Sequence, residues 1–600
     1  MKRTKHIILF LVISMFSFAS CSDYLDKAPE EDLLIEEAFL KRNYAEAFLT
    51  DAYADLPLEN HFTDMADINP FVLASDELNV PWPEKFGKLM NRGAMNPYNA
   101  TGRVWINMYE GIRKCNVFLE NIHLTPVGKD FTQKEKDTWI GEALFLRAIY
   151  HFYIIRVYGP CIIMDRTVKP DDNFNELQRS PLDDCIQFVL DEMDKAIELL
   201  PMTITDASKI GRVTAAAAYA VKSRLLLYRA SDLWNGNPLY KDFKDGNGTY
   251  LFPQTKDASW WEKAAYAARQ CIDSCRKAGY DLYRAASNDP VENYSNLFIE
   301  RNNCEVLLAR NCGVDGDGEK CSFPRSLGGW SGYNPTQAQV DAYEMADGTI
   351  PILGYNSDGS PIINSASGYT ETGFATSDGP NQRWLAGVSN MYVNRDPRFY
   401  ATINFNGAVF KEHQIELWST GADGRGNEGR DYCTTGYLLR KHANPACNIP
   451  QNIFTLRAWI LFRLGEVYLN YAEALNEAEG PVSDVYKYVN EIRNRSGMPD
   501  LPANLSKDEM RERIRRERRI ELSYETHRYF DCHRWMIAED TESGPVYGMN
   551  IAAGTHLQDP EYYKRTVVET RVFPYPQYYM FPIMQTEIDK IEGFMQNPYW

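Results

Sequence analysis

Apolar residues recur every three or four positions along much of this chain, a spacing that predicts amphipathic helices. Seven stretches carry the pattern: 105–122, 142–158, 181–200, 214–233, 260–277, 458–477 and 483–495. Several of them are apolar around nearly the whole circumference, so neighbouring elements must cover them on every side. Six of the seven form consecutive pairs, namely the first with the second, the third with the fourth, and the sixth with the seventh. We therefore expect a mainly α-helical protein built from helical hairpins.

The pairs resemble degenerate tetratricopeptide units without a strict repeat length. Long segments of a different character separate them, at 64–102, 234–259 and above all 311–450, and these are rich in Gly, Pro, Asn and aromatic residues. Loops of this length inside a compact protein usually carry function, and binding residues tend to sit on loops that a rigid scaffold holds. We expect one domain over 21–600. Its helical frame covers about 21–300 and 455–600, and a loop-rich insertion covers about 311–450.

A charged run at 511–525 alternates arginine and glutamate. Arg513 with Glu517, and Glu512 with Arg516, stand four residues apart, which is the spacing of solvated ion pairs on a helix. The glutamates interrupt the arginines, so the run is a poor nucleic-acid patch. We interpret it as a helix with a structural role in packing and ion pairing.

The composition narrows the class of ligand. The formal net charge of the 600 residues is −18, which argues against nucleic acid or an anionic membrane surface as a ligand and favours a neutral one. Aromatic residues make up 13% of the chain, with 37 Tyr and 12 Trp, which suits a carbohydrate- or peptide-contacting surface as well as a core. The motifs of zinc proteases, serine hydrolases, dinucleotide-binding proteins and P-loop enzymes are missing from the sequence. We expect no catalytic residue, no cofactor and no metal.

The N-terminus predicts export and a lipid anchor. A basic start, Met1 to His6, precedes an apolar run from Ile7 to Phe18 that is too short for a stable membrane span. Small residues then lead to Cys21. This arrangement is typical of a bacterial lipoprotein signal over 1–20, with Cys21 as the acylated mature N-terminus. The alternative is an ordinary secretory signal followed by a coincidental cysteine.

The other cysteines and one acidic loop have mainly structural interpretations. Eleven of the 12 cysteines remain after Cys21, without metal-ligand spacing, and we expect most to be buried. A disulfide within 304–321 is compatible with an exported protein. The segment 315–319 (DGDGE) has some of the residues of a calcium loop but not its full spacing, so a solvated turn is the favoured interpretation.

Short motifs spread over the whole mature chain resemble one known family. They are 21–26 (CSDYLD), 112–116 (IRKCN), 142–148 (EALFLRA), 158–160 (YGP), 211–214 (GRVT), 396–398 (DPR), 471–476 (YAEALN), 490–495 (NEIRNR), 517–522 (ERRIEL), 528–531 (RYFD), 534–535 (RW) and 596–598 (QNP). In this order they resemble the SusD/RagB outer-membrane nutrient-binding lipoproteins of the Bacteroidetes. Most of these motifs have a structural explanation: their residues pack helices together, end helices or form ion pairs.

The resemblance implies a SusD-like fold and a function. It implies a protein held by lipid at the outer membrane, facing the cell exterior, as a lid on a TonB-dependent β-barrel transporter of the SusC type. Such a lid captures an oligosaccharide or another nutrient and passes it to the barrel without doing chemistry. Contact with the membrane is then through the N-terminal lipid alone.

Candidate ligand contacts come from the aromatic-bearing loops, because flat apolar faces suit sugar rings and planar polar groups suit hydroxyls. Three clusters offer both: Asp76, Trp82, Arg92, Asn96 and Tyr98 in the first insertion; Phe323, Trp330 and Tyr333 in a glycine-rich segment; and Gln382, Arg383 and Trp384 further on. For each aromatic the alternative is packing onto the helical frame.

Three other functions compete with a glycan-binding lid. A peptide or another nutrient could replace the glycan in the same kind of lid. A surface glycoside hydrolase would need a pair of carboxylates whose separation depends on the fold. A tetratricopeptide-like assembly scaffold would need a smooth concave surface, whereas this chain carries long aromatic-rich insertions.

Overall fold

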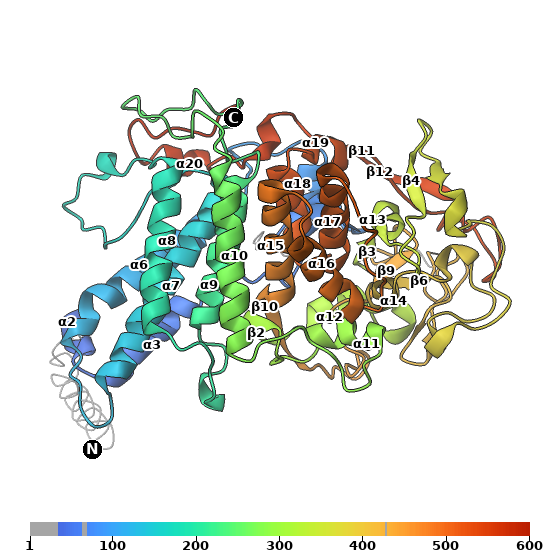
Figure 1. Cartoon of the computed structure of the whole chain (residues 1–600), viewed down its shortest axis with the longest axis horizontal. Coiled ribbons are helices and arrows are strands. Elements are labelled where there is room, and N and C mark those ends of the chain that lie inside the picture. The colour runs from blue at the N-terminus through green and yellow to red at the C-terminus, as the bar shows by residue number, and fades with distance from the viewer. Residues whose placement is uncertain (1–33, 63–68, 426–428) are drawn as a thin grey trace, which may run out of the picture.

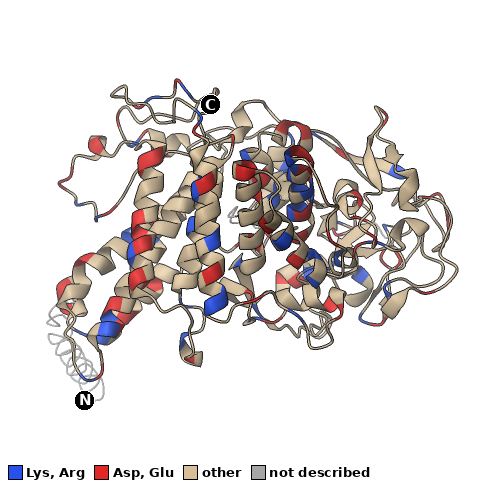
Figure 2. Cartoon of the chain, viewed as in Figure 1, with Lys and Arg blue, Asp and Glu red and all other residues tan. Residues whose placement is uncertain are grey.

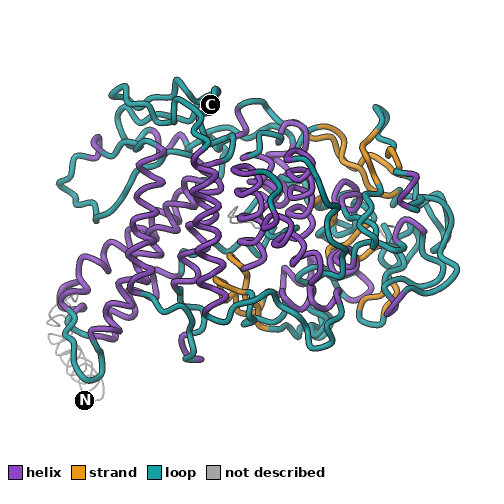
Figure 3. Tube along the Cα trace, viewed as in Figure 1, coloured by secondary structure: helices purple, strands orange, loops and turns teal. Residues whose placement is uncertain are grey.

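The computed structural model describes residues 34–62, 69–425 and 429–600. The predicted signal and Cys21 lie outside the described residues. Helices fill one half of the elongated molecule, and loops with short strands fill the other half (Figures 1 and 3). The protein is therefore mainly α-helical, as the apolar spacing predicts.

The helical half is a continuous layer of packed hairpins. Its helices are α2 (Ile35–Phe39), α3 (Arg42–Tyr53), α6 (Arg103–Asn121), α7 (Gln133–Tyr158), α8 (Leu182–Leu199), α9 (Ala215–Ala230), α10 (Ser259–Lys277), α15 (Leu464–Glu479), α16 (Ser483–Arg495), α17 (Lys507–Glu521) and α18 (His527–Arg534). The predicted pairs are confirmed, since α6 packs on α7, α8 on α9, and α15 on α16. Helix α10 joins the pairs by packing against both α9 and α15. The central helices α7, α9 and α15 are buried over most of their length.

Local chemistry sets the ends of the long helices. The Thr132 side chain accepts a hydrogen bond from the Glu135 backbone N–H at the start of α7, and Thr214 does the same for α9. Helix α7 ends at Gly159, whose φ of 76° is a conformation that glycine adopts without strain, and Pro160 follows. Ser506 and Glu509 form a reciprocal capping box that starts α17.

One predicted helix is partly wrong. The sequence predicts a helix over 458–477, but the structure has strand β10 (Leu456–Arg463) before α15 begins. Strand β10 pairs antiparallel with β2 (Val306–Val314). The apolar and aromatic residues of 456–463 fit both periodicities over so short a stretch, and the pairing with β2 decides in favour of a strand.

The loop-rich half contains short helices and two-stranded antiparallel ladders around its own apolar cluster. The remaining helices are α4 (Phe71–Ala74), α5 (Phe86–Asn91), α11 (Pro290–Ser295), α12 (Gly316–Ser322), α13 (Gln337–Ala342), α14 (Pro397–Thr402), α19 (Ala538–Thr541) and α20 (Gln585–Ile588). The other paired strands are β1 (Leu78–Asn79) with β3 (Asn334–Pro335), β4 (Ile352–Tyr355) with β5 (Pro361–Ile363), β6 (Ile403–Phe405) with β9 (Tyr437–Leu439), β7 (Val409–Phe410) with β8 (His413–Gln414), and β11 (Gly544–Met549) with β12 (Arg565–Arg571).

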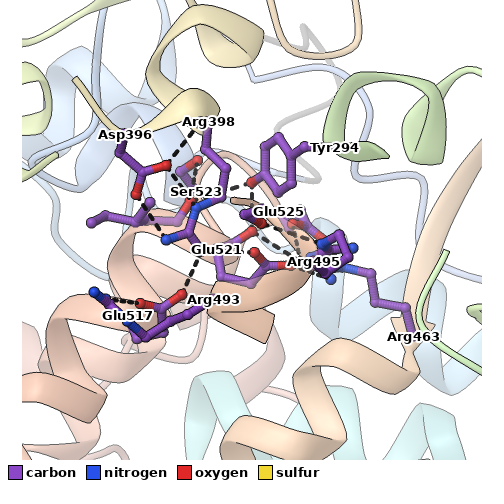
Figure 4. Close-up of polar contacts among 12 residues, drawn as sticks. Tyr294, Asp396, Arg398, Arg463, Arg493, Arg495, Glu517, Glu521, Ser523 and Glu525 are labelled. Atoms are coloured by element: carbon purple, nitrogen blue, oxygen red, sulfur yellow. Dashed lines mark hydrogen bonds and ion pairs between the residues drawn. The ribbon is translucent and has the colours of Figure 1, made fainter. Parts of the chain in front are cut away.

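A buried ion network joins the two halves (Figure 4). At its centre the Glu521 carboxylate, at the end of α17, accepts hydrogen bonds from Arg398, Arg463 and Arg495. These four residues come from α17, α14, β10 and α16, and all are almost fully buried. The network therefore fixes how the loop-rich half sits on the helices.

The helix predicted from the charged run exists as α17, but its predicted ion pairs are wrong. Glu517 is buried and pairs with Arg398 and Arg493 instead of Arg513. Arg513 reaches Glu344 at 3.1 Å. The i,i+4 spacing could not show that partners from other elements reach the buried side of the helix.

The acidic loop differs from expectation, whereas the cysteines are mostly buried, as expected. Asp315 starts α12 and is buried, where it meets His61 at 3.1 Å and Arg457 at 3.2 Å. Glu319 is fully buried as well, so the expected solvated turn is wrong. Among the described cysteines most are buried, and those within 304–321 are free thiols.

Candidate ligand-binding cleft

The β12 cleft is an open cavity of about 580 Å³ on the loop-rich half. It lies where four segments meet: the chain around Trp82 with α5, the loop before β9, the turn after β11, and β12. Its lining comprises Asn79, Val80, Pro81, Pro83, Lys88, Asn91, Arg92, Arg425, Tyr432, Thr434, Asn550, Ile551, Ala552, Thr566, Val567, Val568, Glu569 and Thr570. This lining combines hydroxyl, amide and guanidinium groups with one aromatic ring.

A paired polar network forms one wall of the β12 cleft. The Lys88 ammonium donates to Asn79 Oδ1 at 2.5 Å and pairs with Glu569. Glu569 also accepts from Arg571 Nε at 2.7 Å. The Asn79 Nδ2 group is buried beneath this wall and has no hydrogen-bond partner among the described residues.

One carboxylate pairs with two cations in this wall, so most of its charge is compensated within the protein. Burial lowers the pKa of Lys88, and Glu569 opposes that shift. Burial pushes the pKa of Glu569 up, but Arg571 and Lys88 outweigh it and hold that pKa below its usual value. Because the carboxylate and the ammonium stay paired, the wall offers orientation and hydrogen bonding without a strong net charge.

The rim of the β12 cleft supplies an aromatic face. Tyr432 is partly buried, and the Arg425 guanidinium lies 5.2 Å from its ring centroid. Arg92 is exposed, and its Nη1 donates to the Pro83 carbonyl at 3.2 Å. Two guanidinium groups and a phenol ring therefore stand at the opening, where they can reach a ligand.

The structure brings two of the predicted aromatic residues, Trp82 and Trp330, into contact, and it packs the third, Tyr333, on Phe62. Trp82 lies between the lining residues Pro81 and Pro83, and its ring meets that of Trp330 edge-on with centroids 6.3 Å apart. A Cβ at Gly332 would lie 2.1 Å from Trp82 Cη2, so glycine is what allows the indole to pack there. Trp82 and Tyr333 are buried, whereas Trp330 is partly exposed. The cavity lining includes none of these three rings, and Trp330 alone among them offers surface.

Asp76, from the same predicted cluster, faces away from this group of residues. Its carboxylate pairs with Arg528 at 2.8 Å and with Arg519 at 3.0 Å. Burial acts to raise its pKa, but these arginines dominate and hold the pKa well below its usual range. Asp76 therefore ties the chain to α17 and α18.

The remaining predicted residues lie outside the cavity lining. Asn96 organises a surface turn, accepting from the Tyr98 backbone N–H at 2.9 Å, and Tyr98 is 82% exposed. Trp384 is buried against Tyr400, with ring centroids 5.8 Å apart. Its cluster partners Gln382 and Arg383 flank the same turn, and Phe323 is buried.

Sequence reasoning missed most of the lining. Strand β12 carries no motif, and nothing in its sequence showed that Thr566, Glu569 and Thr570 line a cavity. Tyr432 lies within the long insertion at 311–450, but one tyrosine among the 37 in the chain cannot be singled out. Only Arg92 was both predicted and found in the lining.

Comparison with known proteins identifies the family. A family model described as the SusD family matches residues 308–600, and one described as starch-binding associating with outer membrane matches residues 23–227. The chain belongs to the SusD family, as the ordered motifs indicate.

Individual relatives match the chain along nearly its full length. A SusD-like protein of Bacteroides ovatus is 23% identical, covering 96% of this chain and 95% of its own. The crystal structure of a SusD-like protein from Bacteroides fragilis has a TM-score of 0.74 at 25% identity, over 96% of this chain and 100% of that chain. A SusD-like carbohydrate binding protein from Bacteroides fragilis has a TM-score of 0.69 at 22% identity, over 93% of this chain and 100% of that chain. The fold of this protein is the SusD-like fold.

Proposed function

We propose that this protein is a non-catalytic surface lipoprotein that captures glycan fragments in the β12 cleft and delivers them to a SusC-like TonB-dependent transporter. The observation that carries the proposal is the convergence of an accessible aromatic ring, Tyr432, with hydroxyl, amide and guanidinium side chains in one open cavity. Two findings support the ligand class: the description of one matching family model as starch-binding, and the carbohydrate-binding title of a structural relative.

The chemistry of the β12 cleft suits a neutral sugar. A pyranose ring presents an apolar C–H face, which packs on an aromatic ring, and an edge of hydroxyls, which needs both donors and acceptors. Tyr432 provides the ring, Arg92 an exposed donor, and Thr570 an exposed hydroxyl that can donate and accept. The Thr566 hydroxyl donates to the Met549 carbonyl at 3.2 Å and can accept from a ligand. Because Lys88 and Glu569 are paired, a bound sugar would not have to compensate a buried charge.

The proposed anchor and partner rest on the sequence and the family. Among the described residues no helix is both long and apolar enough to cross a bilayer. The described chain begins at α2, at one end of the molecule, whereas β11 and β12 lie in the other half (Figure 1). Acylation of Cys21 would therefore hold the protein at the helical end and leave the cleft clear of the lipid. The description of one family model includes association with the outer membrane, which supports this location.

Binding to a glycan panel tests the ligand class. Native gels that contain single neutral polysaccharides should retard the purified protein, and calorimetry with the fragments that bind should follow. We expect Tyr432→Ala and Arg92→Ala each to weaken binding by fivefold or more, since each removes a contact worth about 1 kcal/mol or more. Tyr266→Ala and Arg103→Ala remove matched exposed residues outside the cleft and serve as controls.

Other outcomes would replace the proposal. Binding of peptides but of no glycan would move the ligand to the peptide class. New reducing ends released from a glycan that binds would make the protein a glycoside hydrolase. If no SusC-like barrel co-purifies with the tagged lipoprotein from its native membrane, the proposed transporter partner is wrong.

A further inference from the structure

A second concave surface runs along α17, and we name it the α17 groove. It has a volume of about 670 Å³ and lies between α17 and the segment 338–355. Arg513, Arg516 and Arg519 follow one another at three-residue spacing, so they share one face of the helix, and Arg515 lies beside them. The blue segments of this helix in Figure 2 mark its Lys and Arg positions. A protein whose net charge is −18 thus has a groove with a guanidinium wall.

The opposite wall of the α17 groove is apolar. Strand β4 contributes Leu353, which is 63% exposed, and Tyr355, which is 47% exposed. At the floor, the Arg515 guanidinium lies 4.8 Å from the ring centroid of the buried Trp535. The groove therefore presents a row of cations to one side of a ligand and an aromatic, aliphatic surface to the other.

The carboxylates near the middle of the groove already have cationic partners. Asp341 is bound by Arg565 at 2.6 Å and 3.0 Å and accepts from the Tyr355 hydroxyl at 2.7 Å. Glu344 is bound by Arg493 at 2.9 Å and by Arg513 at 3.1 Å. These two carboxylates are already paired, so they do little to neutralise the other arginines of the groove.

The acids of the first turns of α17 are also engaged. Asp508 pairs with Arg511, and the Glu509 carboxylate accepts from the Ser506 backbone N–H at 2.8 Å. Glu512 is the one acid of the helix near Arg515, at 3.6 Å, and its side chain is 72% exposed.

Two arginines of the groove lack a strong carboxylate partner among the described residues and can bind an anionic ligand. Arg516 donates to the Ala342 carbonyl at 2.9 Å, and the described residues place no carboxylate within 4.0 Å of it. Burial lowers the pKa of Arg516, and its neighbours Arg519 and Arg513 lower it further, against the effect of Glu344. The second is Arg515, because a solvated contact at 3.6 Å with Glu512 is weak.

We propose that the α17 groove is a second ligand site, which takes an acidic sugar unit. The carboxylate of the sugar would contact Arg515 and Arg516, and the C–H face of the sugar ring would pack on Tyr355. Guanidinium groups bind carboxylates in paired, charge-assisted hydrogen bonds, and they are weakly hydrated, so such a contact survives at a partly buried site. The inference goes beyond the neutral-glycan function of the β12 cleft and does not depend on it.

The test uses a dimer of galacturonic acid, with the neutral dimer of galactose and inorganic sulfate as comparison probes. Calorimetry on the full mature chain at low salt should show binding of the acidic dimer and at least tenfold weaker binding of the neutral one. Affinity should fall as salt rises, since screening weakens exposed ion pairs. Sulfate that binds as tightly as the acidic dimer would reduce the site to a general anion site and overturn the sugar assignment.

Variants locate the bound dimer. Arg515→Gln and Arg516→Gln should each weaken binding of the acidic dimer by fivefold or more, and Glu512→Gln should strengthen it, because it removes the competing carboxylate. Lys507→Gln is the control on the same helix, and it should change affinity less than twofold, since Lys507 pairs with Glu477 outside the groove. Absence of binding, or unchanged affinity in both Arg515→Gln and Arg516→Gln, would refute the site. Loss of acidic-dimer binding in Tyr432→Ala instead would assign the acidic sugar to the β12 cleft.

Discussion

Replacing Glu521 by Gln tests the buried ion network that joins the two halves of the molecule. The Glu521 carboxylate accepts from Arg398 and Arg463, each at 2.9 Å, and from Arg495. Glutamine keeps the shape but removes the negative charge, and its NH₂ group meets guanidinium donors. Removing one partner of a buried ion pair costs about 3–5 kcal/mol, because the remaining charge is left uncompensated. We expect the free energy of unfolding to fall by that amount.

The melting temperature translates this cost into an observable. With an unfolding entropy of about 2.1 cal/mol/K per residue, a chain of this size should lose roughly 2–4 °C for that loss of stability. Scanning calorimetry on wild type and Glu521→Gln measures the difference. Glu512→Gln is the control on the same helix, because its side chain is 72% exposed and its removal should change stability by at most about 0.5 kcal/mol.

Acid should erase the effect of the substitution. Burial alone would raise the pKa of Glu521, but Arg495, Arg463 and Arg398 outweigh it and hold the pKa far below the ordinary value of 4.5. The stability that this carboxylate contributes is therefore present above about pH 4.5 and is lost as the pH falls toward the folded-state pKa. The difference in stability between wild type and Glu521→Gln should therefore shrink steadily as the pH falls below about 4.5. A melting temperature of Glu521→Gln equal to that of wild type at pH 7 would refute the role we give to the network.

Three further changes have expected outcomes. Leu146→Asp or Leu469→Asp places a carboxylate at a fully buried position of α7 or α15, at a cost of several kcal/mol, and an unchanged melting temperature would contradict the core assignment. Burial raises the pKa of Glu77 to about 8, although the Tyr524 backbone N–H opposes this shift. The stability of the wild type should therefore decline as the pH rises from about 4.5 to 8, because the folded state must lose a proton that it holds more tightly. Glu77→Gln should remove this decline, and a decline that persists in the variant would contradict the assignment to Glu77. Cys21→Ala should release the protein from membranes washed with high salt, and a variant that still sediments with them would exclude the lipid anchor.

The sequence predicts the helical frame well because the helices pack through apolar residues that recur every three or four positions. The segments that became α6, α7, α8, α9 and α10 were predicted with ends shifted by a few residues, apart from an earlier start of α7 at Gln133. The error at 458–463 arose because eight residues of β10 fit a helix or a strand equally well, and the pairing with β2 lies some 150 positions away in the chain. Pairing between distant segments leaves no local signal.

The candidate site could be predicted only in part, for a related reason. Sequence patterns indicate aromatic loops but not which aromatic residues keep an exposed face. Trp384 and Tyr333 pack into the interior, and Trp82 is used to support the chain beside Gly332. Tyr432 reaches the β12 cleft because β12 and the loop before β9 meet there, and that meeting depends on the tertiary fold.

The most direct test of the account is the crystal structure of the protein soaked with the neutral glycan that retards it most strongly in native gels. We predict a sugar ring in the β12 cleft, packed on Tyr432, with a hydroxyl within hydrogen-bond distance of the Thr570 hydroxyl or of the Arg92 guanidinium. A sugar bound at Trp384, along the helical layer, or at any site from which Tyr432 is absent would contradict the central claim.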